Sequence, residues 1–412
     1  MQRGVAATVG DDCEVIVVGL GAMGSCALWS LARRGVNAIG LDQYDPPHDQ
    51  GSSHGETRII RSAMLEGRQY APLIRRAFEL WSELGWEASR DLFVRTGILF
   101  ISRDGPTEMA SMAARSLSDV GLPYEGLGPR ELARRYPQHR GAANLVATFD
   151  PSGGFVRAED TILAALGRAE ERGATVLRWT RALAITSDPR GGVVVETDKG
   201  PVRARRAIVS VGPWLPTFLS GRAVPVTLER QIFAYFELDG LAGFTPEEFP
   251  PFIRDDLLVT SSGVGAHAWL SHGLSGFPSL DGRRIKLLLL EAGRPTTLDT
   301  LDRRVPDALL EELKVTEVDP RLIGVGRPAA GTGKACLYTN APDRDFIIGE
   351  LPGQPNVTLV SACSGHGFKF APAIGELGAD LATATRPRVP VEPFAPSRAV
   401  SYQPSAVSPH GG

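Results

Sequence analysis

A glycine-rich turn near the start of the chain constrains the fold more than any other feature. The apolar run Val15–Val18 leads directly into the sequence Gly19-Leu-Gly21-Ala-Met-Gly24, and a helix-like stretch follows. A strand, a G-x-G-x-x-G turn and a helix together are typical of a dinucleotide-binding βαβ unit. In such a unit Gly19 permits the tight turn, Gly21 lets the backbone approach a pyrophosphate, and Gly24 lets the helix pack close to the strand.

The next apolar segment, residues 37–41, ends at Asp42. This acid follows the glycine turn at about the 20-residue spacing expected for a carboxylate that hydrogen-bonds a ribose. The N-terminus of the intervening helix offers N–H groups and a positive dipole end to phosphates. The sequence therefore predicts a bound dinucleotide, but the motif alone does not distinguish FAD from NAD.

Composition limits the class of protein. The 412 residues suggest two or three domains, and 43% hydrophobic with 22% charged residues is typical of a globular chain. A formal net charge of -3 favours neither nucleic acid nor an anionic membrane as partner. No apolar run approaches the roughly 20 residues of a membrane span, and residues 1–12 do not resemble a secretory signal. None of the four cysteines forms a C-x-x-C pair, so we expect no metal site and a reducing cytoplasmic location.

Apolar periodicity divides the chain into two predicted domains. Helical spacing over residues 68–84, 153–173 and 372–384 alternates with strand-like runs, of which residues 207–211 end at a second glycine, Gly212. Residues 225–330 are rich in Pro and Phe and favour an antiparallel sheet. We assign residues 13–90, 150–224 and 331–385 to a discontinuous nucleotide-binding domain, 91–149 and 225–330 to a substrate-binding domain, and 1–12 and 386–412 to tails.

Three further segments carry a resemblance to a known family. They are Pro46 to Arg61 (PPHDQGSSHGETRIIR), Ala335 to Ile348 (ACLYTNAPDRDFII) and Ser364 to Phe370 (SGHGFKF). Together with the glycine turn, they resemble the monomeric sarcosine oxidase and N-methyltryptophan oxidase family of amine-oxidising flavoproteins, over about residues 13–385. The resemblance implies an α/β fold with a discontinuous Rossmann-like FAD-binding domain and an antiparallel-sheet substrate-binding domain.

In that family FAD is attached through its 8α-methyl group to a cysteine, and the matching residue here is Cys336. An ordinary buried cysteine is the alternative reading. Cys336 follows the polar, turn-rich sequence Gly331-Thr-Gly-Lys-Ala rather than standing in an apolar strand, and Lys334 could favour its thiolate. We therefore expect an 8α-S-cysteinyl FAD. The resemblance adds three more cofactor contacts, at Ser52, Thr57 and Gly367.

The resemblance also assigns a set of cations. Arg61 and Lys369 match the pair that binds the substrate carboxylate, a task suited to a bidentate guanidinium and a point charge. Lys286 matches a lysine near flavin N5 that assists reaction with oxygen, where a fixed positive charge stabilises developing negative charge. Arg58 and His54 match residues near the flavin ring, and Tyr338 matches a tyrosine close to the covalent link.

Several positions depart from the family pattern. Leu290 stands where relatives have a histidine, Ser275 and Met64 stand where sarcosine-type relatives have tyrosines, and Ser53 stands where a histidine is common. These changes remove bulk and polarity near the expected substrate, so a larger or more apolar secondary amine or amino acid is favoured over sarcosine.

The resemblance predicts an oxidase that converts an N-methyl or cyclic amino-acid-like amine to an imine and reduces O2 to H2O2, acting as a monomer without nucleic-acid or membrane partners. Three alternatives stay open. They are a flavin-dependent amine dehydrogenase with another electron acceptor, an NAD-dependent dehydrogenase, and a flavin-binding protein that has lost catalysis.

Overall fold

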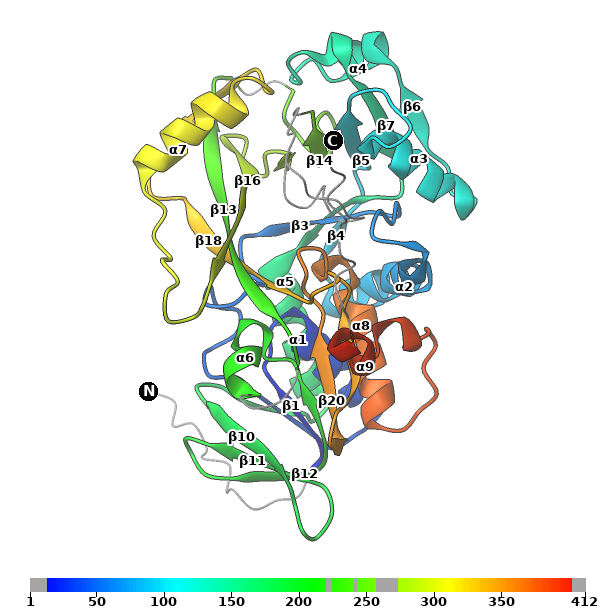
Figure 1. Ribbon diagram of the computed structural model, residues 1–412, viewed down its shortest axis with the longest axis vertical. Helices are drawn as coiled ribbons and strands as arrows, with labels where there is room; N and C mark the ends of the chain where they lie inside the picture. The colour runs from blue at the N-terminus through cyan, green and yellow to red at the C-terminus, as the bar shows by residue number, and fades with distance from the viewer. Residues whose placement is uncertain (1–12, 220–223, 241–242, 257–272, 402–412) are drawn as a thin grey trace, which may run out of the picture. The chain divides into compact units, whose positions relative to one another are not determined.

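The computed structural model describes residues 13–219, 224–240, 243–256 and 273–401, without the side chains of residues 290–294, 400 and 401. The chain forms two compact units, each built from separate stretches of sequence. The first unit comprises Met1–Gln50, Ile162–Leu228 and Thr339–Gly412, and the second comprises Gly51–Thr161 and Glu229–Tyr338. Figure 1 labels most of their helices and strands.

The first unit contains most of the parallel strands. Its strands are β1 (Cys13–Val18), β2 (Ala38–Leu41), β9 (Thr175–Leu177), β10 (Ala182–Ser187), β11 (Val193–Thr197), β12 (Val202–Val209), β19 (Ile347–Leu351) and β20 (Gln354–Ser361). Its helices are α1 (Ala22–Arg33), α6 (Leu215–Phe218), α8 (Ala371–Ala382) and α9 (Pro396–Ser401). Helix α5 (Ala158–Glu171) begins in the second unit and continues into the first.

These strands form one eight-stranded sheet with β1 near its centre. Its order is β10-β11-β12-β1-β2-β9, and β20 pairs with both β12 and β19. β1 runs parallel to β2 on one side and to β12 on the other, while β9 extends the parallel part beyond β2. The chain thus leaves β1 toward one side for β2 and reaches the other side only later, with β12. A crevice at the carboxyl end of such a switch-point strand is where ligands bind in open α/β sheets.

The helices α1 and α8 pack tightly against each other. Ten of the twelve residues of α1 are buried, as expected for a helix covered by both a sheet and another helix. A Cβ added at Gly375 of α8 would lie 2.5 Å from the backbone carbon of Cys26 in α1. A glycine at this position therefore allows the two helices their close approach.

The second unit is dominated by antiparallel strands. They are β3 (Thr57–Ile60), β4 (Phe93–Val94), β5 (Ile98–Ser102), β6 (Glu125–Leu127), β7 (Val146–Asp150), β8 (Gly154–Arg157), β13 (Thr227–Leu238), β14 (Phe252–Asp255), β15 (Leu274–Gly276), β16 (Arg284–Thr296), β17 (Val325–Pro328) and β18 (Lys334–Asn340). The helices are α2 (Ala71–Ala88), α3 (Met109–Asp119), α4 (Pro129–Arg135) and α7 (Asp307–Leu313).

Nine of these strands form one sheet in the order β17-β13-β16-β15-β14-β5-β7-β6, with β18 paired to β13. The pairing of β14 with β5 is parallel, and the resolved neighbours on either side pair antiparallel. Strands β3, β8 and β4 form a separate antiparallel sheet. The parallel strands of the first unit and this antiparallel sheet confirm the predicted α/β class.

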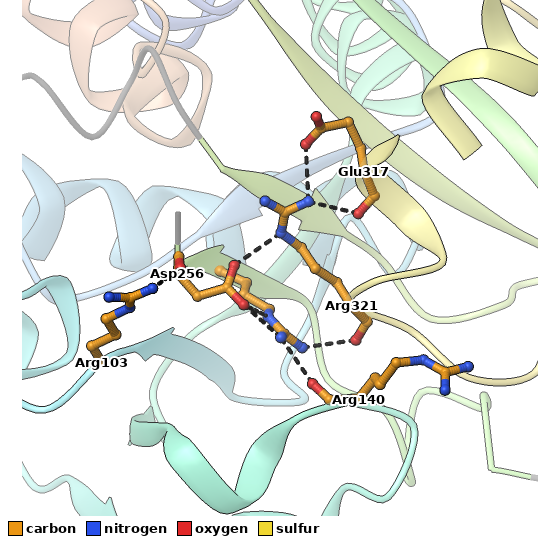
Figure 2. Close-up of polar contacts among 6 residues, drawn as sticks. Arg103, Arg140, Asp256, Glu317 and Arg321 are labelled. Carbon is orange, nitrogen blue, oxygen red and sulfur yellow. Dashed lines mark hydrogen bonds and ion pairs between the residues drawn. The ribbon is translucent and has the colours of Figure 1, made fainter. Parts of the chain in front are cut away.

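A buried ionic network ties the end of β14 to distant parts of the second unit (Figure 2). The Asp256 carboxylate accepts hydrogen bonds from Arg254 Nη2 at 2.6 Å and from Arg321 Nε at 2.9 Å. Arg254 also donates to the carbonyl oxygens of Arg140 and Arg321, at 2.8 and 2.7 Å. Because both guanidinium groups are buried, the shared carboxylate is needed to balance their charge.

The two units differ from the two predicted domains at four places. Residues 51–90, 150–161 and 331–338 belong to the second unit, and residues 225–228 belong to the first, whereas the sequence placed each of these segments in the other domain. For the first segment the reason is β3, which pairs with β8 of the second unit. Which segments bind the cofactor and which bind the substrate stays a prediction.

The expected C-terminal tail is structured over part of its length. Residues 386–401 include a 3₁₀ turn, Glu392–Phe394, and helix α9. Phe394 and Ala399 are buried, and Arg398 Nη2 donates to Phe346 O at 2.6 Å. The Pro- and Ser-rich composition concealed these few anchoring residues. Residues 1–12 and 402–412 lie outside the described residues.

The described residues contain neither a membrane-spanning helix nor a group of metal-binding side chains. None of the helices there is long and apolar enough to cross a membrane. In the same part of the chain, no three His, Cys, Asp or Glu side chains are grouped so that they could hold a metal ion.

Candidate functional site

The glycine turn of the first unit has the geometry of a phosphate-binding loop. Gly19 has φ +89°, and a Cβ there would lie 2.6 Å from Ser210 O. A Cβ at Gly24 would collide with the carbonyl oxygen of Gly19. No side chain caps the start of α1 at Gly21, and the first turn contains no acidic residue. A positive helix end without a competing carboxylate fits the pyrophosphate of a dinucleotide.

Asp42 follows β2 and links the ends of two neighbouring strands. Its Oδ2 accepts a hydrogen bond from Leu20 N at 2.8 Å, and its Oδ1 accepts one from Tyr44 N at 2.9 Å. The carboxylate therefore holds the glycine turn in place, and its contact with a ribose stays a prediction. Since a carboxylate has about four acceptor sites, these bonds leave capacity for a ribose hydroxyl.

An aromatic cluster that the sequence analysis missed surrounds Asp42. The Tyr44 ring lies 4.7 Å from His48, 5.9 Å from Trp214 and 6.4 Å from Trp179, centroid to centroid. His48 Nε2 lies 3.4 Å from Asp42 Oδ1. Trp179 is 60% exposed although it is a large apolar ring, and its φ of +55° is strained for a residue with a side chain. A tryptophan just after a parallel strand, β9, was the available signal.

Gly367 and Lys369 lie just before α8 in the first unit. A Cβ at Gly367 would collide with Ala362 O, so the turn after β20 requires glycine. The Lys369 side chain is buried, and its Nζ donates to His366 O at 2.8 Å and lies 4.4 Å from the centre of the Phe370 ring. A buried ammonium held by a carbonyl and an aromatic face is a strong local source of positive potential.

The second unit brings most of the remaining predicted residues together around the loop of residues 52–57. Arg58, in β3, donates from Nη2 to Ser52 O at 3.0 Å and to His54 O at 2.5 Å, and from Nη1 to Thr57 O at 2.8 Å. The His54 ring is buried and lies 5.6 Å from the Phe233 ring. The loop thus presents its carbonyl oxygens to a guanidinium.

Lys286 of β16 reaches the same loop. Its Nζ donates to Gly55 O, to Thr57 O at 2.8 Å and to Thr57 Oγ1 at 3.4 Å. The ammonium is 4.8 Å from the ring centres of both Phe233 and Phe277. Burial, and next the charge of Arg58, hold the pKa of Lys286 well below its usual range. The Lys286 side chain is therefore buried between two phenyl rings and held by carbonyl oxygens.

Cys336 contacts this cluster, although its surroundings differ from those expected. It is buried within β18, not in a turn-rich segment, because the turn ends at Gly333 and the strand begins at Lys334. Its Sγ lies 3.9 Å from Arg58 Nη2 and 3.8 Å from Ser52 O. The cation that contacts the sulfur is thus Arg58, and the sequence argument from Lys334 pointed to the wrong residue.

The other predicted contacts are distributed more widely. Tyr338 is half-buried two positions after Cys336 in β18. Ser275 is buried in β15, where it pairs with Ile253 and Leu288 of the flanking strands. Met64 is buried, and its N–H donates to Ser116 Oγ at 2.8 Å. Leu290 belongs to β16, but its side chain lies outside the described part of the structure.

Arg61 is buried and already carries a counter-ion. Its Nη2 lies 2.6 Å from Oε1 of Glu66, whose side chain is also buried, and its Nη1 donates to Ala63 O. Arg61 is therefore not a solvated surface arginine. Arg61 belongs to the second unit and Lys369 to the first, so the predicted carboxylate clamp stays a prediction.

Comparison with known proteins shows the family to which the chain belongs. Residues 14–381 match the FAD dependent oxidoreductase (DAO) family. The chain is 34% identical over 391 residues to the monomeric sarcosine oxidase of Streptomyces avermitilis, covering 93% of this chain and 97% of that one. It is 35% identical over 389 residues to the N-methyl-L-tryptophan oxidase of Salmonella typhi, covering 93% and 98%.

Solved structures share the fold at lower identity. The amino acid oxidase NikD of nikkomycin biosynthesis superposes with a TM-score of 0.80 at 22% identity, over 94% of this chain and 98% of that one. Glycine oxidase from Geobacillus kaustophilus superposes with a TM-score of 0.74 at 19% identity, over 94% of this chain and 99% of that one.

The chain therefore belongs to the FAD-dependent oxidoreductase family, and within it to the group of sarcosine and N-methyltryptophan oxidases. It is an FAD-dependent enzyme of the amine and amino-acid oxidase type. The glycine turn at Gly19, the uncapped start of α1 and the acid at Asp42 fit the dinucleotide part of FAD.

Proposed function

We propose that this enzyme oxidises a secondary amine or amino acid, N-methylated or cyclic, to an imine and reduces O2 to H2O2. The observation that supports it most is the cluster of Arg58, Lys286 and Cys336 around one loop of the second unit. When bound, FAD supplies the redox chemistry by accepting two electrons from the amine carbon and passing them to oxygen. The protein supplies position and charge.

Cys336 is the proposed attachment point of FAD. Cys336 would hold FAD through a thioether, whose formation would remove one hydrogen from the thiol and one from the 8α-methyl group, with O2 as the two-electron oxidant. The Arg58 guanidinium lies 3.9 Å from the sulfur, so a positive charge stands beside the proposed attachment atom. Ser52 supports the geometry because its carbonyl oxygen contacts both Arg58 and the Cys336 thiol.

The carboxylate of an amino-acid substrate is the proposed partner of Arg61 and Lys369. Arg61 is bound to Glu66, so a substrate carboxylate would have to replace that carboxylate at the guanidinium. Such an exchange leaves no buried charge unpaired only if Glu66 moves to water or takes up a proton. Lys369 adds a second cation whose resolved partners are a carbonyl and a ring.

Lys286 is the proposed helper of oxygen. A buried ammonium stabilises negative charge as it develops on oxygen, and its burial between two phenyl rings strengthens that effect. No side chain is assigned as a general base, because a neutral amine loses its hydride equivalent without one.

The substrate is proposed to be larger or less polar than sarcosine. Ser275 and Met64 supply a short hydroxyl and a thioether where a tyrosine would fill space, and Leu290 is an apolar residue. A monomer is favoured by the relationship to the monomeric sarcosine oxidase.

The test is intact-protein mass spectrometry followed by a panel of N-methyl and cyclic amino acids scored for peroxide. We expect a mass increase of one FAD that is absent in Cys336→Ala, and one H2O2 for each imine formed. Substrate oxidation without peroxide under air would show that the enzyme is a dehydrogenase and not an oxidase. If no amine reduces the flavin in the absence of air, the protein binds flavin without acting as an amine oxidase.

A further inference from the structure

The loop of residues 52–57 is held from two sides by opposite charges. On one side, both oxygens of the Glu159 carboxylate accept backbone N–H groups, from Gly55 at 2.5 Å and from Glu56 at 2.8 Å. Glu159 stands in the first turn of α5. On the other side, Gly55 O and Thr57 O accept the Lys286 ammonium. The peptide groups of the loop therefore lie between an anion and a cation.

The backbone conformation of the loop is specific to this arrangement. Gly55 has φ +97° and Glu56 has φ +66°, two consecutive residues in the left-handed region. In this turn the N–H groups of Gly55 and Glu56 both point at one carboxylate, that of Glu159. At Gly55 a Cβ would collide with the Phe233 ring, so glycine is required.

Lys286 needs such support because its surroundings oppose its charge. It is 4% exposed, lies between two phenyl rings and is close to the positive Arg58. The groups that favour its protonated form are Cys336, Glu159 and Glu56. Once Cys336 is a thioether it no longer ionises, so two acids remain. The Glu56 carboxylate also accepts a hydrogen bond from Tyr235 OH at 2.9 Å, which weakens its field at the lysine.

We infer that Glu159 is a positioning residue that keeps Lys286 in its ammonium form by acting through the peptide group that joins Gly55 to Glu56, whose N–H it accepts and whose carbonyl oxygen accepts the ammonium. The inference rests on the proposed role of Lys286 in the reaction with oxygen. Glu159 touches neither the amine nor oxygen in this scheme. The carboxylate lies at the N–H end of this peptide dipole and the ammonium at its carbonyl end. The negative charge therefore offsets the cost of burying the charged lysine.

The test uses the flavin-loaded enzyme reduced by substrate without air and then mixed with oxygen at several pH values. In the wild type the reoxidation rate should fall once Lys286 loses its proton. In Glu159→Gln the same fall should begin about one pH unit lower. At the lowest pH the two rates should converge, and anaerobic reduction by the amine should change less than about twofold.

Two further variants make the result specific. Glu159→Asp keeps the charge and should keep the wild-type pH profile, even if it is less stable. Asp160→Asn is the matched control, because it removes a neighbouring negative charge from the same turn of α5, where Asp160 pairs with the exposed Arg90 at 3.2 Å. It should leave the profile unchanged and so exclude an effect of the helix dipole.

The failures of the two ideas differ. If Lys286→Met reacts with oxygen as fast as the wild type, the proposed role of Lys286 is wrong. If Lys286→Met is slow but Glu159→Gln keeps the wild-type pH profile, the role of Glu159 is wrong. A Glu159→Gln rate lowered equally at all pH values, or an Asp variant that behaves like the Gln variant, would also overturn it, since loop distortion then explains the loss.

Discussion

At the scale of single residues, the predicted site cations differ in the partners that hold them. Arg61 is paired with a carboxylate. For Arg58, Lys286 and Lys369, the resolved acceptors are mainly carbonyl oxygens. A carbonyl dipole orients a cation without neutralising it. The carbonyl groups therefore fix where these three side chains point.

Lys369 provides the most direct test of carboxylate recognition. Lys369→Ala should weaken binding of a carboxylate-bearing substrate by about 2–5 kcal/mol if the charge pair is desolvated, and should change binding of the matching decarboxylated amine much less. The measurement is the dissociation constant from anaerobic flavin titrations. Lys199→Ala, at an exposed lysine of the same unit, is the control. Equal losses for both amines would count against the clamp.

Gly19 and Gly35 require glycine for different reasons. Gly35 also has positive φ, +71°, but a Cβ there would meet nothing within 4 Å, whereas at Gly19 it would meet Ser210 O. Gly35→Ala should lower the free energy of unfolding by about 1–2 kcal/mol through strain alone. Gly19→Ala should lower it by about 2–5 kcal/mol and release the cofactor. Urea unfolding and flavin content measure both, and equal losses would contradict a steric role for Gly19.

At the scale of elements, aromatic rings lie beside Asp42 after the strands of the first unit. Among these rings, that of Trp179 is exposed. We predict that this ring stacks on the nucleotide end of FAD. Trp179→Phe in the Cys336→Ala background should reduce the quenching of tryptophan fluorescence on FAD addition, and Trp179→Ala should weaken binding by about 1–3 kcal/mol. Trp86→Phe is the control, because Trp86 of α2 is 84% exposed. Unchanged quenching in Trp179→Phe would exclude the contact.

The strand β14 carries a pH-dependent contribution to stability. The His139 ring lies beside it, stacked on Phe249 at 5.4 Å and edge-on to Phe252 at 4.8 Å, centroid to centroid. Burial, and next the charge of Arg254, lower the pKa of His139 to about 3. Below about pH 6.5 the unfolded chain therefore binds a proton that the folded chain does not. As the pH is lowered from about 6.5 toward the folded-state pKa of about 3, the free energy of unfolding should therefore fall by up to about 1.4 kcal/mol per pH unit.

His139→Phe should flatten that slope, as measured by urea unfolding from pH 7 to pH 4. Phe249→Leu keeps the imidazole but removes its stacking partner. It should lower stability by a similar amount at each pH. A slope that survives in His139→Phe would assign the effect to other groups.

The elements also show what sequence can and cannot predict. The βαβ unit was predictable because Gly19, Gly24 and Asp42 stand at fixed spacings along consecutive elements. Strand β3 was not, because its residues Thr57–Ile60 are stabilised by pairing with β8, about a hundred positions away. Glu159 was missed for the same reason. Nothing in its local sequence reveals that its carboxylate receives two N–H groups from residues 55 and 56.

At the scale of the whole molecule, a covalent cofactor changes how stability depends on concentration. A non-covalent ligand stabilises by an amount that grows with its free concentration, about 1.4 kcal/mol for each tenfold increase above the dissociation constant. We predict that the melting temperature of wild-type holoprotein is unchanged by dilution or by added FAD. That of Cys336→Ala should rise with added FAD. A wild-type melting temperature that also depends on FAD would argue against the thioether.

The central strand of the first unit has a consequence for the order in which the protein can be made. β1 leaves the ribosome first, but its neighbour β12 emerges near residue 202, and β20, which borders β12, emerges only after residue 354. Long-range parallel pairing of this kind is slow and leaves strand edges exposed. A nascent chain therefore waits for most of translation with its nucleotide-binding sheet unfinished, and a transcript cut short anywhere before β20 would yield a protein that cannot close that sheet.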